Sequence, residues 1–244
     1  MSETEKIINL KSIISHIDNF ETKVELLVNY AHAIFETNKK FNLTGYKTVE
    51  DVISGLIIDS IVPMKSLNVP RGTSFIDIGT GSGVPGVVLG ILYPHITGVL
   101  VDSTAKKIDF INETCCKLEI NNIKAVSIRA EEFSSKQENK KRFGFCVTKA
   151  FGPLYYSAEF AGPVLKEGGF LYIYSHLQNK ILSAQLKGHF SALGFNDAAN
   201  EKRDKYCVAD CGLMWIKERE TPAKYPRRFT IIKKEAEKVP ETCN

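Results

Sequence analysis

The sequence lacks any hydrophobic run long enough to cross a membrane. Its longest apolar stretch, Gly83 to Tyr93, is too short to span a bilayer and is interrupted by Pro85 and Gly86. The first residues, Met-Ser-Glu-Thr-Glu-Lys, are acidic and do not read as a signal peptide. We therefore expect a cytoplasmic protein that does not associate with membranes.

Paired cysteine motifs are also missing. The chain has 6 cysteines among 244 residues, with no CxxC pair and no Cys/His cluster at zinc-ligand spacing. Cys207 and Cys211 are four residues apart, which is only a weak signal for a metal or a disulfide. The pattern favours reduced thiols and predicts no metal site.

A strong excess of charge of one sign is absent too. The formal net charge is only +4, and 43% of the residues are hydrophobic, so disorder is excluded as the main state. A chain of this length can bury roughly 70–75% of its unfolded surface without disulfides. The composition therefore suits one globular domain, or one domain with a small appendage.

The apolar spacing divides the chain into two parts. Residues 3–40 and about 48–64 show helical spacing, and a turn cluster at 70–73 marks a boundary. Beyond it, helical segments alternate with strand-like runs at 75–78, 97–101, 123–128, 145–148 and 170–174, which indicates βαβ units on a parallel sheet. Strand character also appears at 206–209, 214–216 and 229–232, and two of these segments could pair antiparallel at the sheet edge. We predict an α/β fold, mostly parallel with an antiparallel edge, with a helical extension over 1–70 and a core over 71–244 in one compact unit.

A glycine-rich loop follows the first predicted strand. Gly79, Gly81 and Gly83 lie where an open α/β sheet binds a nucleotide-like ligand. An acid about 20 residues further on is typical of dinucleotide sites, and Asp102 has that spacing. Asp77, however, would repel a pyrophosphate and attract the ammonium of an amino-acid-bearing nucleotide. This favours S-adenosylmethionine, with a dinucleotide or a purely structural turn as alternatives.

Acidic residues follow the next two strands. The pattern favours Asp102 as the acid that binds ribose hydroxyls, with a solvated carboxylate at a strand end as the alternative. Residues 129–133 could meet an adenine amino group, or could be a helix start with favourable acids in its first turn.

These residues resemble a known family. The run from Phe75 to Gly86, then Val101-Asp102-Ser103 with Lys106-Lys107, then Ala130-Glu131-Glu132-Phe133, is similar to the bacterial RsmG (GidB) family. The likeness extends over about residues 25–234 through Asn42-Leu43-Thr44, Asp59-Ser60, Pro153-Leu154, Leu165 to Phe170 and Lys224-Tyr225-Pro226-Arg227. It implies a Rossmann-like methyltransferase that uses S-adenosylmethionine to methylate N7 of a guanine in small-subunit (16S) ribosomal RNA.

The residue pattern and the resemblance together predict two sets of site residues. The cofactor set is Asp77, Gly79, Thr80, Gly81, Gly83, Val84, Asp102, Ser103, Ala130, Glu131 and Lys149. Residues 224–234 carry five cations, no acid and two interleaved aromatics, which is typical of RNA binding and equally of a solvated edge strand. The RNA set is Asn42, Lys224, Tyr225, Arg227, Arg228 and Lys233.

The chain also departs from the family pattern at several positions. Lys149 stands in place of an arginine, which replaces a planar fork of donors by a point charge. Leu56 stands where a histidine is common, Ser175-His176 where Lys-Gly is common, and Gly212 where an arginine is usual. If these positions touch RNA, affinity or the choice of target base changes.

The sequence shows no obvious general base. Its five histidines, His16, His32, His95, His176 and His189, are scattered and without recognisable partners. Guanine N7 carries a lone pair and no proton, so alignment and electrostatics suffice for methyl transfer, and Lys149 is the candidate for positioning. We expect a monomer whose partner is small-subunit ribosomal RNA or an assembly intermediate. The alternatives are a methyltransferase of the same fold acting on a small molecule or protein, a catalytically weak RNA-binding relative, and a dinucleotide oxidoreductase.

Overall fold

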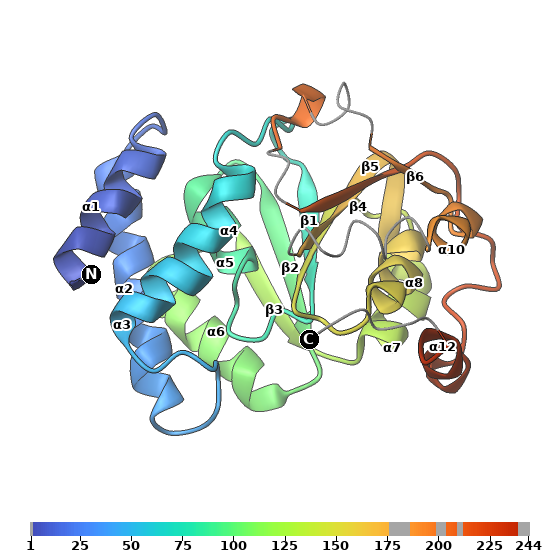
Figure 1. The fold of residues 1–244 in the computed structure, drawn as a ribbon, viewed down its shortest axis with the longest axis horizontal. Coiled ribbons are helices and arrows are strands. Elements are labelled where there is room, and N and C mark those ends of the chain that lie inside the picture. Colours follow the sequence, from blue (N-terminus) through green and yellow to red (C-terminus); the bar gives the residue numbers. More distant parts are fainter. Residues whose placement is uncertain (1, 176–185, 199–203, 209–211, 239–244) are drawn as a thin grey trace.

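The computed structural model describes residues 2–175, 186–198, 204–208 and 212–238. Its centre is a seven-stranded sheet in the order β3-β2-β1-β4-β5-β7-β6 (Figure 1). The first five strands are parallel, and β7 runs antiparallel to both β5 and β6. The strands are β1 (Ser74–Ile78), β2 (Thr97–Asp102), β3 (Ile123–Ser127), β4 (Phe143–Lys149), β5 (Leu165–Tyr174), β6 (Phe195–Asp197) and β7 (Leu213–Lys217). The predicted α/β fold, with its parallel sheet and antiparallel edge, is confirmed.

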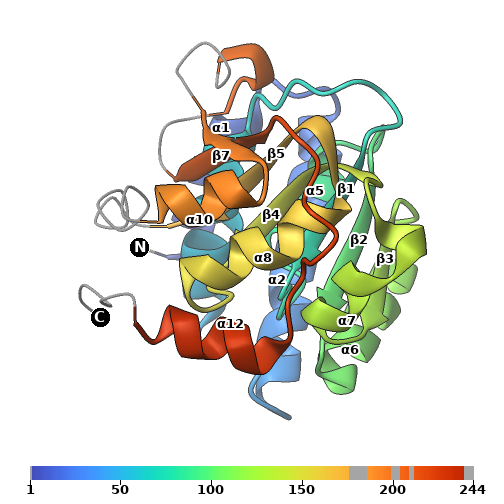
Figure 2. The same ribbon diagram turned by 90° about the vertical axis from the view of Figure 1, so that its right-hand side faces the viewer.

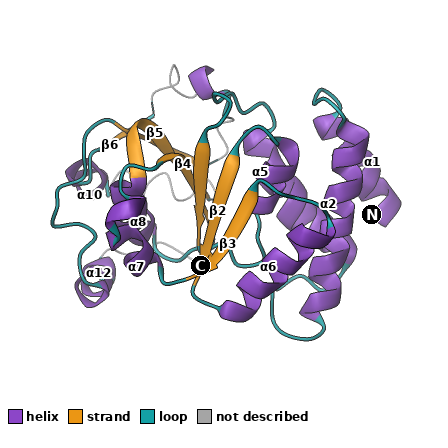
Figure 3. Ribbon diagram, turned by 180° about the vertical axis from the view of Figure 1, so that it is seen from behind, coloured by secondary structure: helices purple, strands orange, loops and turns teal. Residues whose placement is uncertain are grey.

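Helices cover both faces of the sheet, as Figure 3 shows. One face carries α1 (Glu3–Ile14), α2 (Phe20–Asn38), α3 (Val49–Asp51), η1 (Val52–Ile58), α4 (Asp59–Ile61), η2 (Val62–Met64), α5 (Gly86–Leu92) and α6 (Ala105–Lys117). The other face carries α7 (Ala130–Ser135), η3 (Gln137–Asn139), α8 (Leu154–Val164), α10 (Lys187–Ala192) and α12 (Phe229–Ala236). Strands covered on both sides must be apolar throughout, which is why β1 and β4 read as nearly continuous hydrophobic runs.

The N-terminal helices pack into the same core as the sheet. Ser2 caps α1 in a reciprocal capping box with Glu5, and one face of the helix buries Leu10 and Ile14. Those side chains belong to one hydrophobic cluster with residues of α2, α5 and the sheet, such as Leu27 and Phe75. A second cluster lies on the opposite face, between the sheet, α8, α10 and α12. The N-terminal helices therefore stabilise the sheet directly.

Three predictions of secondary structure need correction. Residues 229–232 form the start of α12 and not a strand, because Ile232 and Ala236, one helical turn apart, are both buried against the second cluster. Tyr206 lies in a helical turn. The helix expected over 48–64 is divided by η1, a π-helical segment. None of the helices in the described ranges combines the length and the apolar character that a bilayer crossing requires.

Candidate active site

A cavity of about 560 Å³ opens at the carboxyl ends of β1, β2, β3 and β4. Parallel strands bring their following loops together at this edge, which is the usual ligand site of open α/β sheets. The volume lies within the range of small-molecule sites. The predicted cofactor residues that line it are Gly79, Thr80, Gly81, Val84, Asp102, Ser103, Ala130, Glu131 and Lys149. Asp77 and Gly83 are not among the lining residues.

The three positions of the loop require glycine for different structural reasons. All three adopt a positive φ: +74° at Gly79, +58° at Gly81 and +84° at Gly83. A Cβ on Gly79 would lie 2.1 Å from the ring of Phe151, and a Cβ on Gly83 would lie 2.1 Å from the hydroxyl of Tyr30. A Cβ on Gly81 would meet only a backbone oxygen, at 3.9 Å. Gly83 thus serves the packing of α2, whereas Gly81 presents bare backbone to the cavity.

Asp77 is buried behind this loop. Its Oδ2 accepts hydrogen bonds from the Thr80 hydroxyl (2.7 Å) and from the backbone N–H of Gly86 (2.9 Å). Its Oδ1 is buried and has no hydrogen-bond partner among the described residues. Burial raises the pKa of Asp77 from 3.8 to about 7, against the lowering effect of those two hydrogen bonds. Asp77 therefore fixes the loop from behind and leaves one acceptor atom unused.

Asp102 connects the end of β2 to the same loop. Its Oδ2 accepts from the N–H of Gly81 at 3.1 Å, and its Oδ1 accepts from the N–H of Thr104 at 2.9 Å. A carboxylate offers about four lone-pair sites, so both oxygens keep acceptor capacity toward the cavity. Its half-buried carboxylate is held in a position where hydroxyl groups of a bound ligand can reach it.

Lys149 is held by the N-terminal helices. Its ammonium donates to the carbonyls of Gly55 (3.2 Å) and Leu56 (3.4 Å) in η1, and to the hydroxyl of Ser60 (3.1 Å). Asp59 lies 3.8 Å away. Burial lowers the pKa of Lys149, while Asp59 opposes that effect. The lysine thus joins β4 to a π-helical segment, a type of distortion that is common at functional sites.

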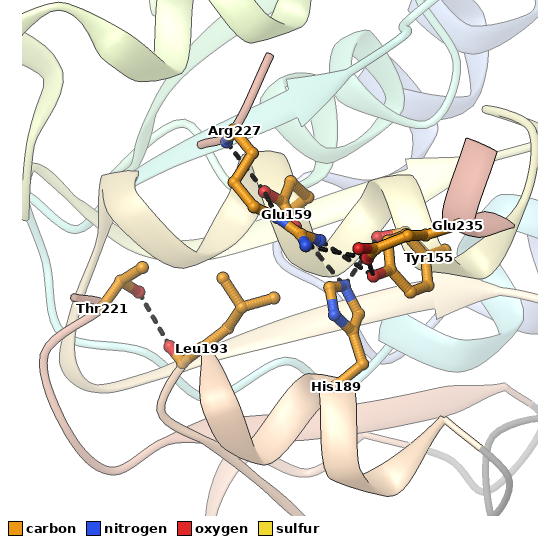
Figure 4. Close-up of polar contacts among 7 residues, drawn as sticks. All are labelled: Tyr155, Glu159, His189, Leu193, Thr221, Arg227 and Glu235. Atoms are coloured by element: carbon orange, nitrogen blue, oxygen red, sulfur yellow. Dashed lines mark hydrogen bonds and ion pairs between the residues drawn. The ribbon is translucent and has the colours of Figure 1, made fainter. Parts of the chain in front are cut away.

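The predicted RNA-binding residues divide into two groups. Asn42, Lys224, Arg228 and Lys233 are exposed. Tyr225 is only 7% exposed, and its ring cannot offer an open face to a base. Arg227 points inward, as the next contacts show (Figure 4). The expected tail of exposed cations and aromatic rings is therefore corrected at Tyr225 and Arg227.

Arg227 forms the centre of an internal ion-pair network (Figure 4). Its backbone N–H (2.8 Å) and two guanidinium nitrogens (3.1 and 3.0 Å) donate to the carboxylate of Glu159, which is fully buried in α8. The guanidinium also donates to Glu235 (2.8 Å) and to the hydroxyl of Tyr155 (2.8 Å). The ring of His189 stacks on Tyr155 at 3.6 Å. The network ties the segment before α12, and α12 itself, to α8.

The cavity is also lined by residues that were not in the two predicted sets. Thr44 and Tyr46 reach the cavity from the N-terminal part, and Phe151, Tyr156 and Phe229 line it from the other side. Thr44 belongs to the Asn-Leu-Thr loop noted in the sequence, and Phe229 to the aromatics of the basic tail. Tyr46, Phe151 and Tyr156 carry no local signal, because only the fold brings them to the cavity.

The positions at which this chain departs from the family pattern can be located in the structure where it describes them. Leu56 lines the cavity. A Cβ on Gly212 would lie 2.4 Å from the hydroxyl of Tyr172, so a larger side chain there requires that ring to move. Ser175 is half-buried, and His176 lies outside the described residues. The four histidines that the structure describes are not among the cavity-lining residues. Within the described ranges no group of three or more His, Cys, Asp or Glu could hold a metal ion.

Comparison with known proteins identifies the family. The family model described as rRNA small subunit methyltransferase G matches residues 23–203. This chain belongs to that family. It is 33% identical over 217 residues to the ribosomal RNA small subunit methyltransferase G of Fervidobacterium nodosum, covering 87% of this chain and 97% of the relative. It is 31% identical over 223 residues to the protein of the same name from Mycoplasmoides gallisepticum, covering 88% and 90%.

Solved structures agree on the fold of this family member. A chain from the complex between the Haloferax volcanii Trm112 methyltransferase activator and a methyltransferase aligns with a TM-score of 0.50 at 13% identity. The alignment covers 78% of this chain and 98% of that chain. At this identity the likeness supports the Rossmann-like fold alone.

Proposed function

We propose that this protein transfers a methyl group from S-adenosylmethionine to N7 of a guanine in small-subunit ribosomal RNA. The observation that carries the proposal is the cavity beside the glycine loop, in a chain that belongs to the methyltransferase G family. We further propose that it acts as a monomer on the small ribosomal subunit or on an assembly intermediate.

The residues present fit this cofactor. The bare backbone at Gly81 allows close approach, and the carboxylate of Asp102 suits ribose hydroxyls. Ala130 and Glu131 line the cavity after β3 and would meet the adenine side. The buried carboxylate of Asp77, with its unused oxygen, favours a cation such as the ligand's ammonium near the loop. When bound, the cofactor supplies the methyl group.

The chemistry asks little of the protein beyond alignment. Guanine N7 attacks through a lone pair in the plane of the ring, and no proton has to leave. The side chains around the cavity therefore need only to hold the base in line, exclude water and fix the local charge. Lys149 would serve as a positioning residue, because it links the wall formed by η1 to the end of β4.

Cations near the cavity support an RNA substrate. Lys107 and Arg129 line the cavity, and the side chain of Arg129 is 70% exposed. Arg228 lies directly before Phe229, another lining residue, and is exposed. The proposed RNA contacts are these cations together with Asn42, Lys224 and Lys233. RNA binding through the cations should weaken as the salt concentration rises, because salt ions compete for the phosphates. Arg227 and Tyr225 are left out of direct contact with RNA because they are engaged inside the protein.

The test is a methylation assay on small subunits from a strain that lacks the modification. Purified protein and methyl-labelled S-adenosylmethionine are mixed with intact subunits, naked 16S RNA, or large subunits as a control. We expect label in the small-subunit RNA, and mass analysis of nuclease fragments should find it as 7-methylguanosine. Label at another base would refute the N7 assignment. Cofactor binding without any RNA methylation would favour a small-molecule or protein substrate instead.

A further inference from the structure

An aromatic rim borders the cavity on the side of α8 and α12. The ring centroids of Tyr156 and Phe229 are 5.5 Å apart at an interplanar angle of 57°. Both side chains line the cavity, together with Phe151 and Phe160. Phe229 is 36% exposed, which is unusual for a phenylalanine in a folded domain. This exposed ring borders a cavity and is therefore a candidate for contact with a ligand.

The position of Phe229 follows from the helix that carries it. Phe229 continues the apolar face of α12 one turn before Ile232, but Ile232 is fully buried and Phe229 is not. Phe229 extends past the packed interface and lies over the cavity beside Tyr156. Ile231 is also exposed, at 44%, but it lies on the opposite face of α12 and does not line the cavity.

The ion-pair network anchors the segment that carries this ring. Arg227, two residues before Phe229, binds buried Glu159, and Glu235 in the last turn of α12 binds both Arg227 and Tyr155 (Figure 4). Figure 2 shows α12 lying along α8, and the two helices are in contact. The segment that carries Phe229 is therefore anchored on both sides, so its backbone loses little conformational freedom when a ligand binds.

We propose that Phe229 and Tyr156 form a stacking surface for a purine base bound at the cavity. The proposal rests on the proposed function, which brings two purines to this site: the adenine of the cofactor and the guanine to be methylated. An aromatic face stacks on any base, and such a contact is sensitive to loss of the ring. The adjacent cation Arg228 is exposed and placed to meet a phosphate of the strand that delivers the base.

The experiment compares Phe229→Ala, Phe229→Leu and Phe229→Tyr with the matched control Ile231→Ala. For each variant we would measure S-adenosylmethionine affinity by calorimetry and kcat/KM for methylation of small subunits. Loss of base stacking should lower one of these quantities about 5- to 150-fold in Phe229→Ala. Phe229→Leu should lose nearly as much because it keeps apolar area without a π face, and Phe229→Tyr should remain near wild type. Ile231→Ala should match wild type.

The two measurements separate the two purines. Weaker cofactor binding assigns the adenine, whereas lower kcat/KM at unchanged cofactor affinity assigns the guanine. Wild-type values for Phe229→Leu, or for Phe229→Ala in both measurements, would overturn the stacking role. A wild-type protein that neither binds the cofactor nor methylates RNA would instead refute the proposed function, so the two failures are distinguishable.

Discussion

Replacing Asp77 by asparagine tests the electrostatics behind the glycine loop. Both donors to this side chain, the Thr80 hydroxyl and the Gly86 N–H, reach the same oxygen, Oδ2. An asparagine carbonyl can accept both of these bonds, and its NH₂ group then takes the place of the unpartnered Oδ1. Asp77→Asn therefore removes the charge with almost no change of shape.

The expected size follows from the raised pKa. Asp77 has a pKa of about 7 in the folded protein, against 3.8 for an ordinary aspartate. At 1.36 kcal/mol for each tenfold change in acid strength, ionising it in the fold costs about 4 kcal/mol more than in the unfolded chain. Between pH 4 and 7 the unfolded chain has lost this proton while the folded protein keeps it. The stability that Asp77 contributes is therefore present below pH 4 and is lost as pH rises to about 7.

Urea denaturation at pH 4.5, 6 and 8 measures this effect. The single tryptophan, Trp215, is buried in β7 and reports unfolding by fluorescence. The unfolding free energy of Asp77→Asn, relative to wild type, should rise by about 3 kcal/mol between pH 4.5 and 8, since about 1 kcal/mol of the full change is already complete at pH 4.5. Other titrating groups cancel in this comparison. A difference that stays constant with pH, or that falls as pH rises, would refute the raised pKa.

The same variant tests the cofactor proposal. Since Asp77 ionises near pH 7, the affinity of wild type for S-adenosylmethionine, relative to that of Asp77→Asn, should increase between pH 6 and 7.5, because the ligand carries an ammonium group. The ligand's own amino group titrates at about pH 8 in both experiments, so it cancels in this comparison. Equal pH dependence in the two proteins would refute an electrostatic effect of Asp77 on cofactor binding.

Five further substitutions separate the roles of residues in the glycine loop, at Lys149 and in the basic tail. Gly81→Val should weaken cofactor binding in calorimetry, because it puts a strained β-branched side chain at the cavity. Gly83→Ala should mainly lower the thermal midpoint of unfolding, because its Cβ meets Tyr30. The reverse pattern would contradict the roles assigned to the two glycines. Lys149→Met should cost about 1–3 kcal/mol in urea denaturation because it removes the charge-assisted hydrogen bonds to Gly55, Leu56 and Ser60, and wild-type stability would argue against the link between β4 and η1. Arg227→Met should lower the free energy of unfolding by about 3–5 kcal/mol, because it removes the hydrogen-bonded guanidinium from the buried carboxylate of Glu159. Arg228→Met should leave stability unchanged and reduce the salt dependence of RNA binding, and the opposite result for this pair would reverse their assignments.

Local patterns predicted that a glycine turn follows the first strand and that Asp102 lies at the same edge of the sheet. A turn that joins a strand to a helix is encoded within a few residues, and parallel strands then place Gly81 and Asp102 at the same edge, where the structure joins them by a hydrogen bond. The spacing alone did not show that Gly83 serves packing, because its neighbour Tyr30 lies on a helix distant in sequence.

Long-range contacts explain the errors in the C-terminal part. Residues 229–232 read as a strand because phenylalanine, threonine and isoleucine favour strands, but burial of Ile232 against α8 and its neighbours selects a helix. Arg227 reads as an RNA contact because it stands in a basic run. Its partner, Glu159, lies 68 residues earlier in the sequence. Glu159 is the one acid in the apolar helix α8, and the sequence around it gives no indication of which cation pairs with it.

The pairing of Glu159 with Arg227 also bears on where the folding unit ends along the chain. Every strand of the described sheet ends by Lys217, ten residues before this arginine. A chain cut between the two would keep all of those strands, and the buried Glu159 carboxylate would lose Arg227 and keep only the His189 ring, 3.6 Å away, as a potential cation among the described residues. The last strand of the described sheet is thus not the end of the folding unit, because the guanidinium that forms hydrogen bonds with the buried Glu159 carboxylate lies beyond it.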